Sequence, residues 1–537
     1  MDRKAFLAVV LSLIVLFAWQ LFFAQKPVKQ SPEQTQQDAS VDQKEVAKEV
    51  VAGPGAPIRS RTIVSPSVTE TERDISVETP LYSAVFTTKG GALKSFRLKN
   101  YRKTIASNSE SIELVHVMDG MPRPLSISFP DSHLDISPDS LFAANIGSLD
   151  LTQTQESRRL TFTLSYPNSM KVEKTYTFHP DKYAFDLEAK VLNLAEFSIT
   201  QNILLTWNQF VDPKLETDSY THEGPVSFIS RSIDRHEVKK IDSGKLQGPD
   251  VSWGGFESKY FIASMISQNP TLTSLLLSRD TRNMVSISLK GPQNLIPPGQ
   301  AGLFGYTLYL GPKDHDLLRA QGVGLENAID FGDWMKWLAM PLLITLKFFY
   351  KYAHNYGLAI IIMTLLIKII FWPLGNKSYK SMKEMQKLQP KLAQLREKYK
   401  NDKTKIGQET MALYKTHKVN PLGGCLPMVI QIPVFFGLYK TLMYAIELRH
   451  APFFWWIQDL SEKDPYYITP IIMGATMFIQ QKMTPPMGDP MQQKIMLIMP
   501  VAFTFLFLSF PSGLVIYWLF QNVLSIGQQY YINKRPS

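Results

Sequence analysis

The sequence predicts a polytopic α-helical membrane protein with six spans and a large all-β domain outside the bilayer. Residues 5–24 and most of residues 337–532 are strongly apolar, whereas residues 25–330 form a polar stretch with strand-like patterns. The chain has 537 residues, which is enough for several domains. Its average composition, 45% hydrophobic and 19% charged, resembles that of a soluble protein. The segregation of the apolar residues is therefore what predicts the fold class.

Several classes of function are disfavoured by missing motifs. Cys425 is the single cysteine, so an internal disulfide and a CxxC redox site are excluded. The nine histidines never fall at HxxxH spacing, and no GxxxxGK[ST] or GxSxG motif is present. We therefore expect no metal, no cofactor and no nucleotide-dependent or serine-hydrolase activity.

The first predicted span lies at residues 5–24, within an N-terminal anchor of residues 1–24. About 20 apolar residues suffice to cross the hydrocarbon core, and this run is longer than a signal-peptide core. A cleaved signal is the alternative, because Ala24 is small and a polar segment follows. Arg3 and Lys4 precede the span, which predicts a cytoplasmic N-terminus. Residues 25–60, rich in Gln and Pro, are expected to be a flexible linker.

Residues 61–318 are predicted to form a β-sandwich. Apolar and polar residues alternate strictly over residues 183–191, as one buried sheet face requires. Similar runs recur every 8 to 12 residues. His179, Glu188 and Trp253 suggest a sugar-active site, but no paired carboxylates can be argued, so scattered core and surface roles are the favoured interpretation.

An amphipathic helix at residues 331–352 is expected to lie in the headgroup plane, because Trp and Lys recur at helical spacing. Further spans are predicted at residues 357–374, 422–446, 467–481, 495–510 and 512–530, with the last four inside residues 421–532. Residues 375–420 contain twelve basic and four acidic side chains, a net charge of +8, and are therefore placed in the cytoplasm. The tail at residues 533–537 is then cytoplasmic as well.

The basic loop at residues 375–420 is predicted to be a mobile helical hairpin kinked at Pro390. Met382, Met385, Leu388 and Leu392 follow at spacings of 3, 3 and 4 and make one apolar stripe, the predicted platform that receives substrates. DNA binding is the rival explanation for the charge. Attraction to anionic lipid or ribosomal RNA explains the positive charge of this loop equally well. We therefore expect no DNA partner.

Polar residues inside the predicted spans indicate a cytoplasm-facing, water-containing cavity. Lys368 in the middle of an apolar run costs about 2.5–3.5 kcal/mol on insertion scales, which usually marks function; snorkelling to the cytoplasmic interface is the alternative. Thr364 and Trp372, at i−4 and i+4, are predicted to share its face. Another stripe is predicted at Trp518, Asn522, Ser525 and Gln529, and Gln431 interrupts a third span.

Four segments resemble the YidC/Oxa/Alb family of membrane protein insertases. They are NPLGGCLPMVIQIPVFFGLYKTL (420–442), APFFWWIQDLSEKDPYYITPIIMG (451–474), DPMQQKIMLIMP (489–500) and FPSGLVIYW (510–518); TTKGGALKSFRLKNY (87–101) is similar to the periplasmic domain of Gram-negative members.

The resemblance implies a β-supersandwich periplasmic domain and a five-helix insertase core with a hydrophilic groove. Lys368, Gln431 and Trp518 match groove positions, with Thr364 and Asn522 beside them. The groove cation of the family is usually Arg. Lys368 keeps the charge but lacks the planar guanidinium group that can bind a carboxylate through two hydrogen bonds.

The expected function is insertion of nascent membrane proteins into the cell inner membrane through that groove, with the Sec translocon, the ribosome and membrane lipids as partners. The alternative is a secondary transporter or channel for a small anion. A third hypothesis, a membrane-anchored carbohydrate-active enzyme, lacks a recognisable catalytic pair.

Overall fold

The computed structural model describes residues 71–132, 134–212, 221–241, 244–332, 334–399, 402–417, 419–420, 426–484 and 490–534. The predicted anchor and linker, residues 1–60, lie outside these residues, as does the end of the tail. The chain divides into two units, one with residues 62–376 and 426–537 and the other with residues 1–61 and 377–425.

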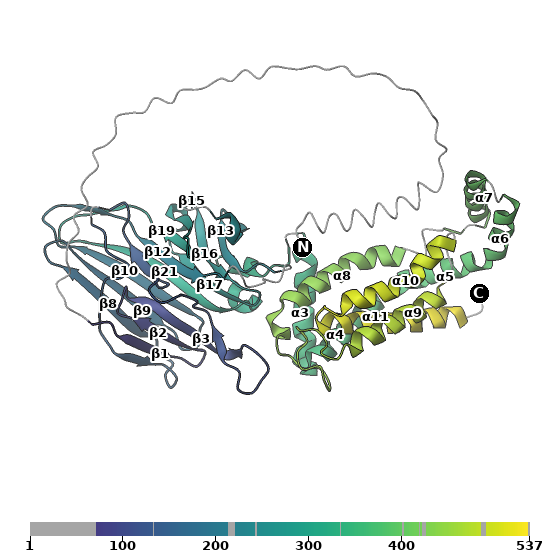
Figure 1. The fold of residues 1–537 in the computed structure, drawn as a ribbon, viewed down its shortest axis with the longest axis horizontal. Helices are drawn as coiled ribbons and strands as arrows, with labels where there is room; N and C mark the ends of the chain where they lie inside the picture. Colours follow the sequence, from purple (N-terminus) through teal and green to yellow (C-terminus); the bar gives the residue numbers. More distant parts are fainter. Residues whose placement is uncertain are drawn as a thin grey trace, which may run out of the picture. The chain divides into compact units, whose positions relative to one another are not determined.

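The larger unit begins with a β-rich domain (Figure 1), which confirms the predicted all-β region. A nine-stranded sheet has the order β14 (Ser232–Arg235), β13 (Gly224–Ile229), β16 (Val251–Glu257), β17 (Phe261–Ser267), β21 (Ala301–Pro312), β10 (Ala184–Asn193), β9 (Met170–Phe178), β8 (Arg158–Tyr166), β6 (Ala143–Ala144). One five-stranded sheet has the order β4 (Ser111–Glu113), β3 (Ala92–Arg102), β2 (Tyr82–Thr87), β1 (Asp74–Glu78), β7 (Ser148–Asp150).

A second five-stranded sheet has the order β15 (Lys245–Gln247), β18 (Ser274–Arg279), β19 (Met284–Lys290), β12 (Leu204–Phe210), β5 (Ser126–Ser128), and a small sheet pairs β11 (Ile199–Gln201) with β20 (Asn294–Ile296). The short helices of this region are η1 (Val238–Lys240), η2 (Pro270–Leu272), α2 (His315–Arg319) and η3 (Leu325–Ala328).

The core of this domain lies between the sheets. In β10 the side chains at 185, 187, 189 and 191 are buried, as the alternation predicts. Phe86 of β2 packs on Tyr176 of β9 with ring centroids 4.8 Å apart, so these two sheets meet face to face. Gly254 of β16 leaves room for Leu275 and Ile287 from the other five-stranded sheet. The specific supersandwich topology stays a prediction.

One lysine is enclosed in this core. Lys174 of β9 is fully buried, and its Nζ donates hydrogen bonds to the carbonyls of Gly90 at 3.0 Å, Gly91 at 2.7 Å and Leu125 at 2.7 Å. Burial lowers the pKa of Lys174 to about 7. The three carbonyls take the place of the hydration shell that the side chain loses on folding.

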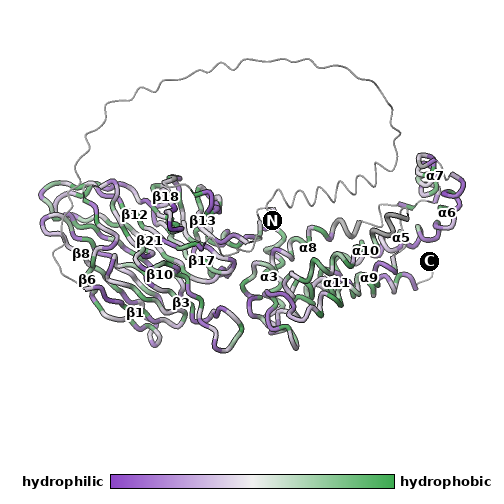
Figure 2. The backbone as a smooth tube through the Cα atoms, viewed as in Figure 1, coloured by the Kyte–Doolittle hydropathy of each residue, from purple (hydrophilic) through white to green (hydrophobic). Residues whose placement is uncertain are grey.

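The helices follow the β-rich domain along the chain. They are α3 (Lys336–Ala353), α4 (Tyr356–Ile370), α5 (Trp372–Lys387), α6 (Gln389–Lys398), α7 (Lys403–Thr416), α8 (Leu426–Tyr444), η5 (Ile446–Leu448), α9 (Ile468–Met483), α10 (Pro490–Phe507) and α11 (Ser512–Lys534). Hydrophobic colour is frequent along α10 and α11, whereas α6 is mostly hydrophilic (Figure 2). Within the described part of the chain, no helix taken alone has both the length and the apolar character to cross a membrane. The pair α4 and α5 meets that test jointly, with a 64° bend between them.

The prediction of one continuous helix at residues 357–374 is wrong, because the structure divides this segment between two helices. Helix α4 ends at Ile370 and α5 starts at Trp372, because Pro373 has no N–H to donate to the preceding turn. Trp372 therefore does not share a helix with Lys368, and the expectation that both line one face is corrected. The predicted break near Pro390 is observed as the change from α5 to α6 at Leu388.

Helix α3 is amphipathic in a particular way. Ala339, Leu342, Leu343 and Leu346 are buried, while Trp337, Ile344 and Phe348 are exposed apolar side chains at spacings of 7 and 4. One face thus packs within the unit, and the other leaves large apolar groups uncovered. This pattern agrees with a helix on a membrane surface, which stays a prediction.

Ion pairs connect the β-rich domain to the helices within the larger unit. Lys347 of α3 lies 2.5 Å from Asp316 of α2 and 3.4 Å from both Asp314 and Glu447. Asp330 accepts a hydrogen bond from the Tyr444 hydroxyl of α8 at 3.2 Å. These contacts hold the end of the β-rich domain against helices α3 and α8.

Candidate functional site

Helix α11 presents a buried polar face to its neighbours. Gln521, Asn522, Ser525, Gln528 and Gln529 are all nearly inaccessible to solvent, although amides and hydroxyls normally remain in water. Such a concentration of buried polar groups on one helix is expensive unless each group has a partner. The partners of these side chains define the site.

Lys368 lies inside the helical bundle, opposite this face. Its side chain is only 8% exposed, and its Nζ donates a hydrogen bond to Ser525 Oγ at 2.7 Å. Ser525 Oγ in turn donates to the Gln521 carbonyl at 2.7 Å. Among the described residues, no carboxylate forms an ion pair with Lys368. The ammonium group therefore points inward, with one neutral acceptor and no counter-ion from this part of the chain.

Thr364, one turn before Lys368, is completely buried. Its hydroxyl donates to the Ile360 carbonyl at 2.7 Å, so its donor is used within α4. The hydroxyl oxygen remains able to accept a hydrogen bond.

The predicted stripe on α11 divides between two neighbouring helices. Asn522 Nδ2 donates to Thr476 Oγ1 of α9 at 3.3 Å, and Gln529 Nε2 donates to the Met483 carbonyl at the end of α9 at 2.8 Å. Ser525, by contrast, faces α4. The single stripe expected from the spacing is corrected to two, because α11 packs between α4 and α9 and each helix meets a different part of its surface.

Trp518 lies among aromatic side chains. Its ring is 4.8 Å from that of Phe435 in α8 and 5.4 Å from that of Phe507 in α10, measured between centroids. Gln431 is half-buried in α8. The hydrogen bonds of the described residues do not join Trp518 or Gln431 to Lys368, so a common groove for all three stays a prediction.

Several buried polar atoms of α11 have no hydrogen-bond partner among the described residues, including Trp518 Nε1 and the side-chain oxygens Oε1 of Gln521, Gln528 and Gln529. A buried polar atom without a partner costs about 1–3 kcal/mol. Three free acceptors on the helix that also binds Lys368 make this face suited to water or to the polar groups of a passing chain.

Gln521 and Gln528 are the residues that the sequence reasoning missed. Gln521, Ser525 and Gln528 are spaced by 4 and 3 residues, which is a second helical stripe beside the one that was recognised. Gln528 Nε2 donates to the Trp372 carbonyl at 3.2 Å and to Asn376 Oδ1 at 3.0 Å.

The predicted platform residues do not lie on a single helix. Met382 and Met385 belong to α5, Leu388 stands at the break, and Leu392 belongs to α6. Met382, Met385, Leu388 and Leu392 are all buried. Helix α7 of the same unit is capped by the Asp402 carboxylate, which accepts from the Lys405 N–H at 2.9 Å. A substrate can reach these four buried side chains only after they are uncovered, and their role as a platform stays a prediction.

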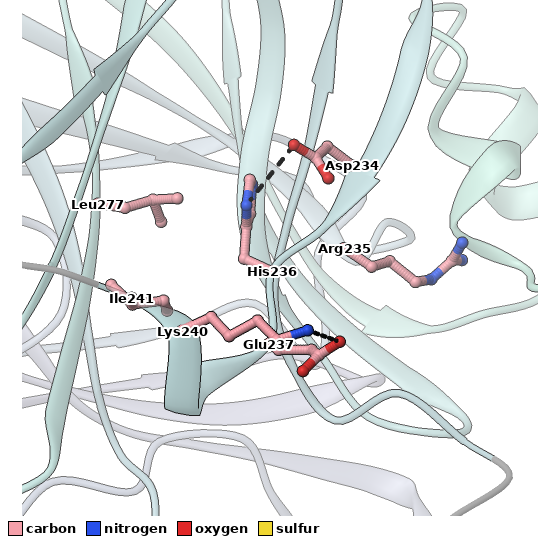
Figure 3. Close-up of a pocket in the computed structure, with 7 residues that line it drawn as sticks. All are labelled: Asp234, Arg235, His236, Glu237, Lys240, Ile241 and Leu277. Carbon is pink, nitrogen blue, oxygen red and sulfur yellow. Dashed lines mark hydrogen bonds and ion pairs between the residues drawn. The ribbon is translucent and has the colours of Figure 1, made fainter. Parts of the chain in front are cut away.

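The contacts of His179 and Trp253 in the β-rich domain bear on the hypothesis of a sugar-active site. His179 is hydrogen-bonded to Asp186 at 3.1 Å and Trp253 is stacked on Phe228, which are structural roles. A hollow of about 210 Å³ is lined by Asp234, His236, Glu237 and Lys240 (Figure 3). Glu237 pairs with Lys240 at 2.8 Å, and Asp234 lies 3.7 Å from His236. Each carboxylate thus already faces a basic group, which does not favour the acid and base pair of a glycosidase.

Comparison with known proteins gives consistent matches. Residues 348–537 match the family described as 60Kd inner membrane protein, and residues 74–345 match the YidC periplasmic domain. The chain is 65% identical to the membrane protein insertase YidC of Syntrophus aciditrophicus (strain SB), over 100% of both chains. It is 44% identical to the protein of that name from Geobacter metallireducens, over 99% of this chain and 98% of the relative. A crystal structure titled as an active YidC insertase with its first transmembrane domain resolved is 20% identical, covering 87% of this chain and 95% of that one, with a TM-score of 0.38.

Proposed function

Because the chain belongs to the YidC family of membrane protein insertases, we propose that it inserts nascent membrane proteins through the polar face between α4, α9 and α11. Family members are inner membrane proteins with a periplasmic domain, which assigns the β-rich domain to the periplasm. The groove itself, its residues and its mechanism are the proposal.

The observation that supports it is the buried ammonium of Lys368, bound to Ser525 Oγ at 2.7 Å. A buried charge without a counter-ion is costly, and an incoming carboxylate reduces that cost. A substrate whose polar N-terminal tail carries Asp or Glu supplies such a carboxylate. The free amide oxygens on α11 then accept hydrogen bonds from the backbone N–H groups of the tail.

The energy for insertion comes from the substrate. Moving its apolar segment from water to lipid yields roughly 25 cal/mol for each Å² that leaves water. The membrane potential acts on charges in the tail, at about 2.3 kcal/mol per charge per 100 mV. No nucleotide is consumed in this scheme. The polar face lowers the barrier for the hydrophilic tail, which is the part that the bilayer rejects.

The proposed topology has six spans, with both termini and the hairpin at residues 375–420 in the cytoplasm. The basic hairpin is the proposed contact for ribosomal RNA and anionic lipid, and cooperation with the Sec translocon is proposed from the family resemblance. Exposed aromatic groups on α3 support its placement on the outer leaflet.

Purified protein in vesicles tests the proposal directly. A small single-span substrate, added without ATP, should become protected from external protease in proteoliposomes and not in empty liposomes. Flux of a small anion with no protection of the substrate would instead support the channel hypothesis. Turnover of a glycoside by the same preparation would support an enzyme.

A further inference from the structure

The junction between α4 and α5 is bound on both sides by one face of α11. Before the junction, Lys368 Nζ donates to Ser525 Oγ at 2.7 Å. After it, Gln528 Nε2 donates to the Trp372 carbonyl at 3.2 Å and to Asn376 Oδ1 at 3.0 Å. Ser525 and Gln528 are three residues apart and so are neighbours on the surface of α11. The two contacts lie on either side of Phe371, where the helices bend by 64°.

We propose that Gln528 is a positioning residue for insertion, because its side-chain amide fixes the angle at which α5 leaves α4. The part of α5 that Gln528 contacts, residues 372–376, belongs to the larger unit. The consequence for insertion rests on the proposed function. The angle itself can be measured without any substrate.

The junction needs such support because its own backbone is weakened. Pro373 has no N–H, which removes one hydrogen bond from the helical ladder. The Phe371 N–H still donates to the Ile367 carbonyl, and the Gly375 N–H donates to the Phe371 carbonyl. A helix interrupted in this way is a hinge unless other contacts set its angle. The two hydrogen bonds from Gln528 are contacts of that kind.

A glycine makes the close approach possible. Gly375 is buried in the first turns of α5, and a Cβ added there would lie 2.8 Å from Gln528 Nε2. The atoms it would meet are the far end of a flexible side chain, so an alanine would displace the amide rather than prevent folding. Gln528 is only 1% exposed, and its Oε1 has no partner among the described residues. The amide is thus held through its N–H groups alone.

Helix α5 carries both the contacts of Gln528 and two of the proposed platform residues. Met382 and Met385 are buried and lie on α5, beyond the junction. The same face of α11 holds Lys368, so a substrate carboxylate that takes the ammonium from Ser525 acts one helical turn from the hinge.

Spin labels test the hinge in the whole protein. With Cys425→Ser as background, cysteines replace Ile362 in α4 and Lys380 in α5, both of which are exposed. Electron–electron double resonance in nanodiscs without substrate gives the reference distance distribution of the original protein. Gln528→Met, which keeps the length but loses the donor, should broaden or shift that distribution. Gly375→Ala should do the same from the opposite side of the contact.

The matched control is Gln529→Ala. Gln529 is the adjacent residue, is equally buried and binds the Met483 carbonyl of α9 instead of α5. Its replacement should leave the distance distribution unchanged. If Gln528→Met and Gly375→Ala both give the original distribution, the hinge assignment is overturned.

Insertion by the same variants tests the positioning role. Gln528→Met should slow insertion of acidic-tailed and neutral-tailed substrates at least threefold and by the same factor, because Lys368 keeps its partner. Normal insertion despite a broadened distribution overturns the role in insertion. Failure of the original protein to insert any substrate would refute the proposed function, while the distance measurement would still test the contact itself.

Discussion

Replacing Lys368 is the most direct perturbation of the proposed mechanism. If the ammonium attracts acidic groups, Lys368→Arg should retain insertion because the charge is kept. Lys368→Ala should weaken insertion, most of all for substrates with acidic N-terminal tails. Lys368→Glu should be worse, since like charges repel in a site with little water.

The magnitude follows from the position of the ammonium. A substrate carboxylate that replaces Ser525 as its partner would lie within about 4 Å, where two unit charges interact by about 1 kcal/mol in bulk water and about 4 kcal/mol at an effective dielectric constant of 20. The site is buried but contains several polar atoms, so both limits are relevant. At about 1.4 kcal/mol per tenfold change, Lys368→Ala should slow insertion of an acidic-tailed substrate by roughly fivefold to several-hundredfold.

The assay compares two substrates in the same vesicles. They share one apolar segment and differ only in whether the tail carries Asp and Glu or Asn and Gln. The ratio of the two insertion rates removes differences in protein amount and folding between variants. A ratio unchanged by Lys368→Ala would refute the role of the lysine and favour the snorkelling alternative.

Three further predictions follow from other parts of the chain. Deleting residues 377–418 should abolish insertion yet leave the remaining helices folded by circular dichroism; normal insertion by a stable deletion would exclude the platform. Removing residues 65–315 should leave insertion largely intact, because the proposed site lies among the helices, and its loss with folded helices would contradict that location. For Lys174, a folded pKa of about 7 against an unfolded value near 10.5 means that the unfolded chain binds more protons between these pH values, so stability rises with pH. Pulse proteolysis should show the stability of the original protein relative to Lys174→Met rising by up to about 1.4 kcal/mol per pH unit from pH 7 to 10, and a constant difference would count against this account.

Much of the fold could be predicted from periodicity. The strand at residues 184–193 and the larger helices recur in the structure where alternation or apolar runs placed them. The span predicted at residues 357–374 is the exception, because a run of apolar residues has the same pattern whether the helix is straight or bent. Pro373 was part of the predicted span, and only the structure shows that α4 ends before it.

The candidate site was predicted less completely. Lys368 stood out because a charge in an apolar run is rare, and its buried position could not be distinguished from snorkelling by sequence. Helical spacing grouped Asn522 with Ser525, although they contact different helices. The spacing of residues along a helix shows only roughly which side of the helix they occupy. The angle and position at which neighbouring helices cross determine which side chain contacts which partner.

Helix α11 explains why structure and proposed function depend on the same residues. It contacts α4 through Ser525, α9 through Asn522 and Gln529, and α5 through Gln528, while Trp518 packs against α8 and α10. Between helices in lipid, apolar side chains give little preference for protein over solvent, so packing and polar contacts determine the arrangement. Each glutamine amide has an NH2 donor group and an oxygen acceptor. Here the NH2 groups of Gln528 and Gln529 bind neighbouring helices, while their oxygens have no partner in the described part of the chain. A face that assembles the bundle through its donors thus keeps acceptors available for the polar tail of a substrate.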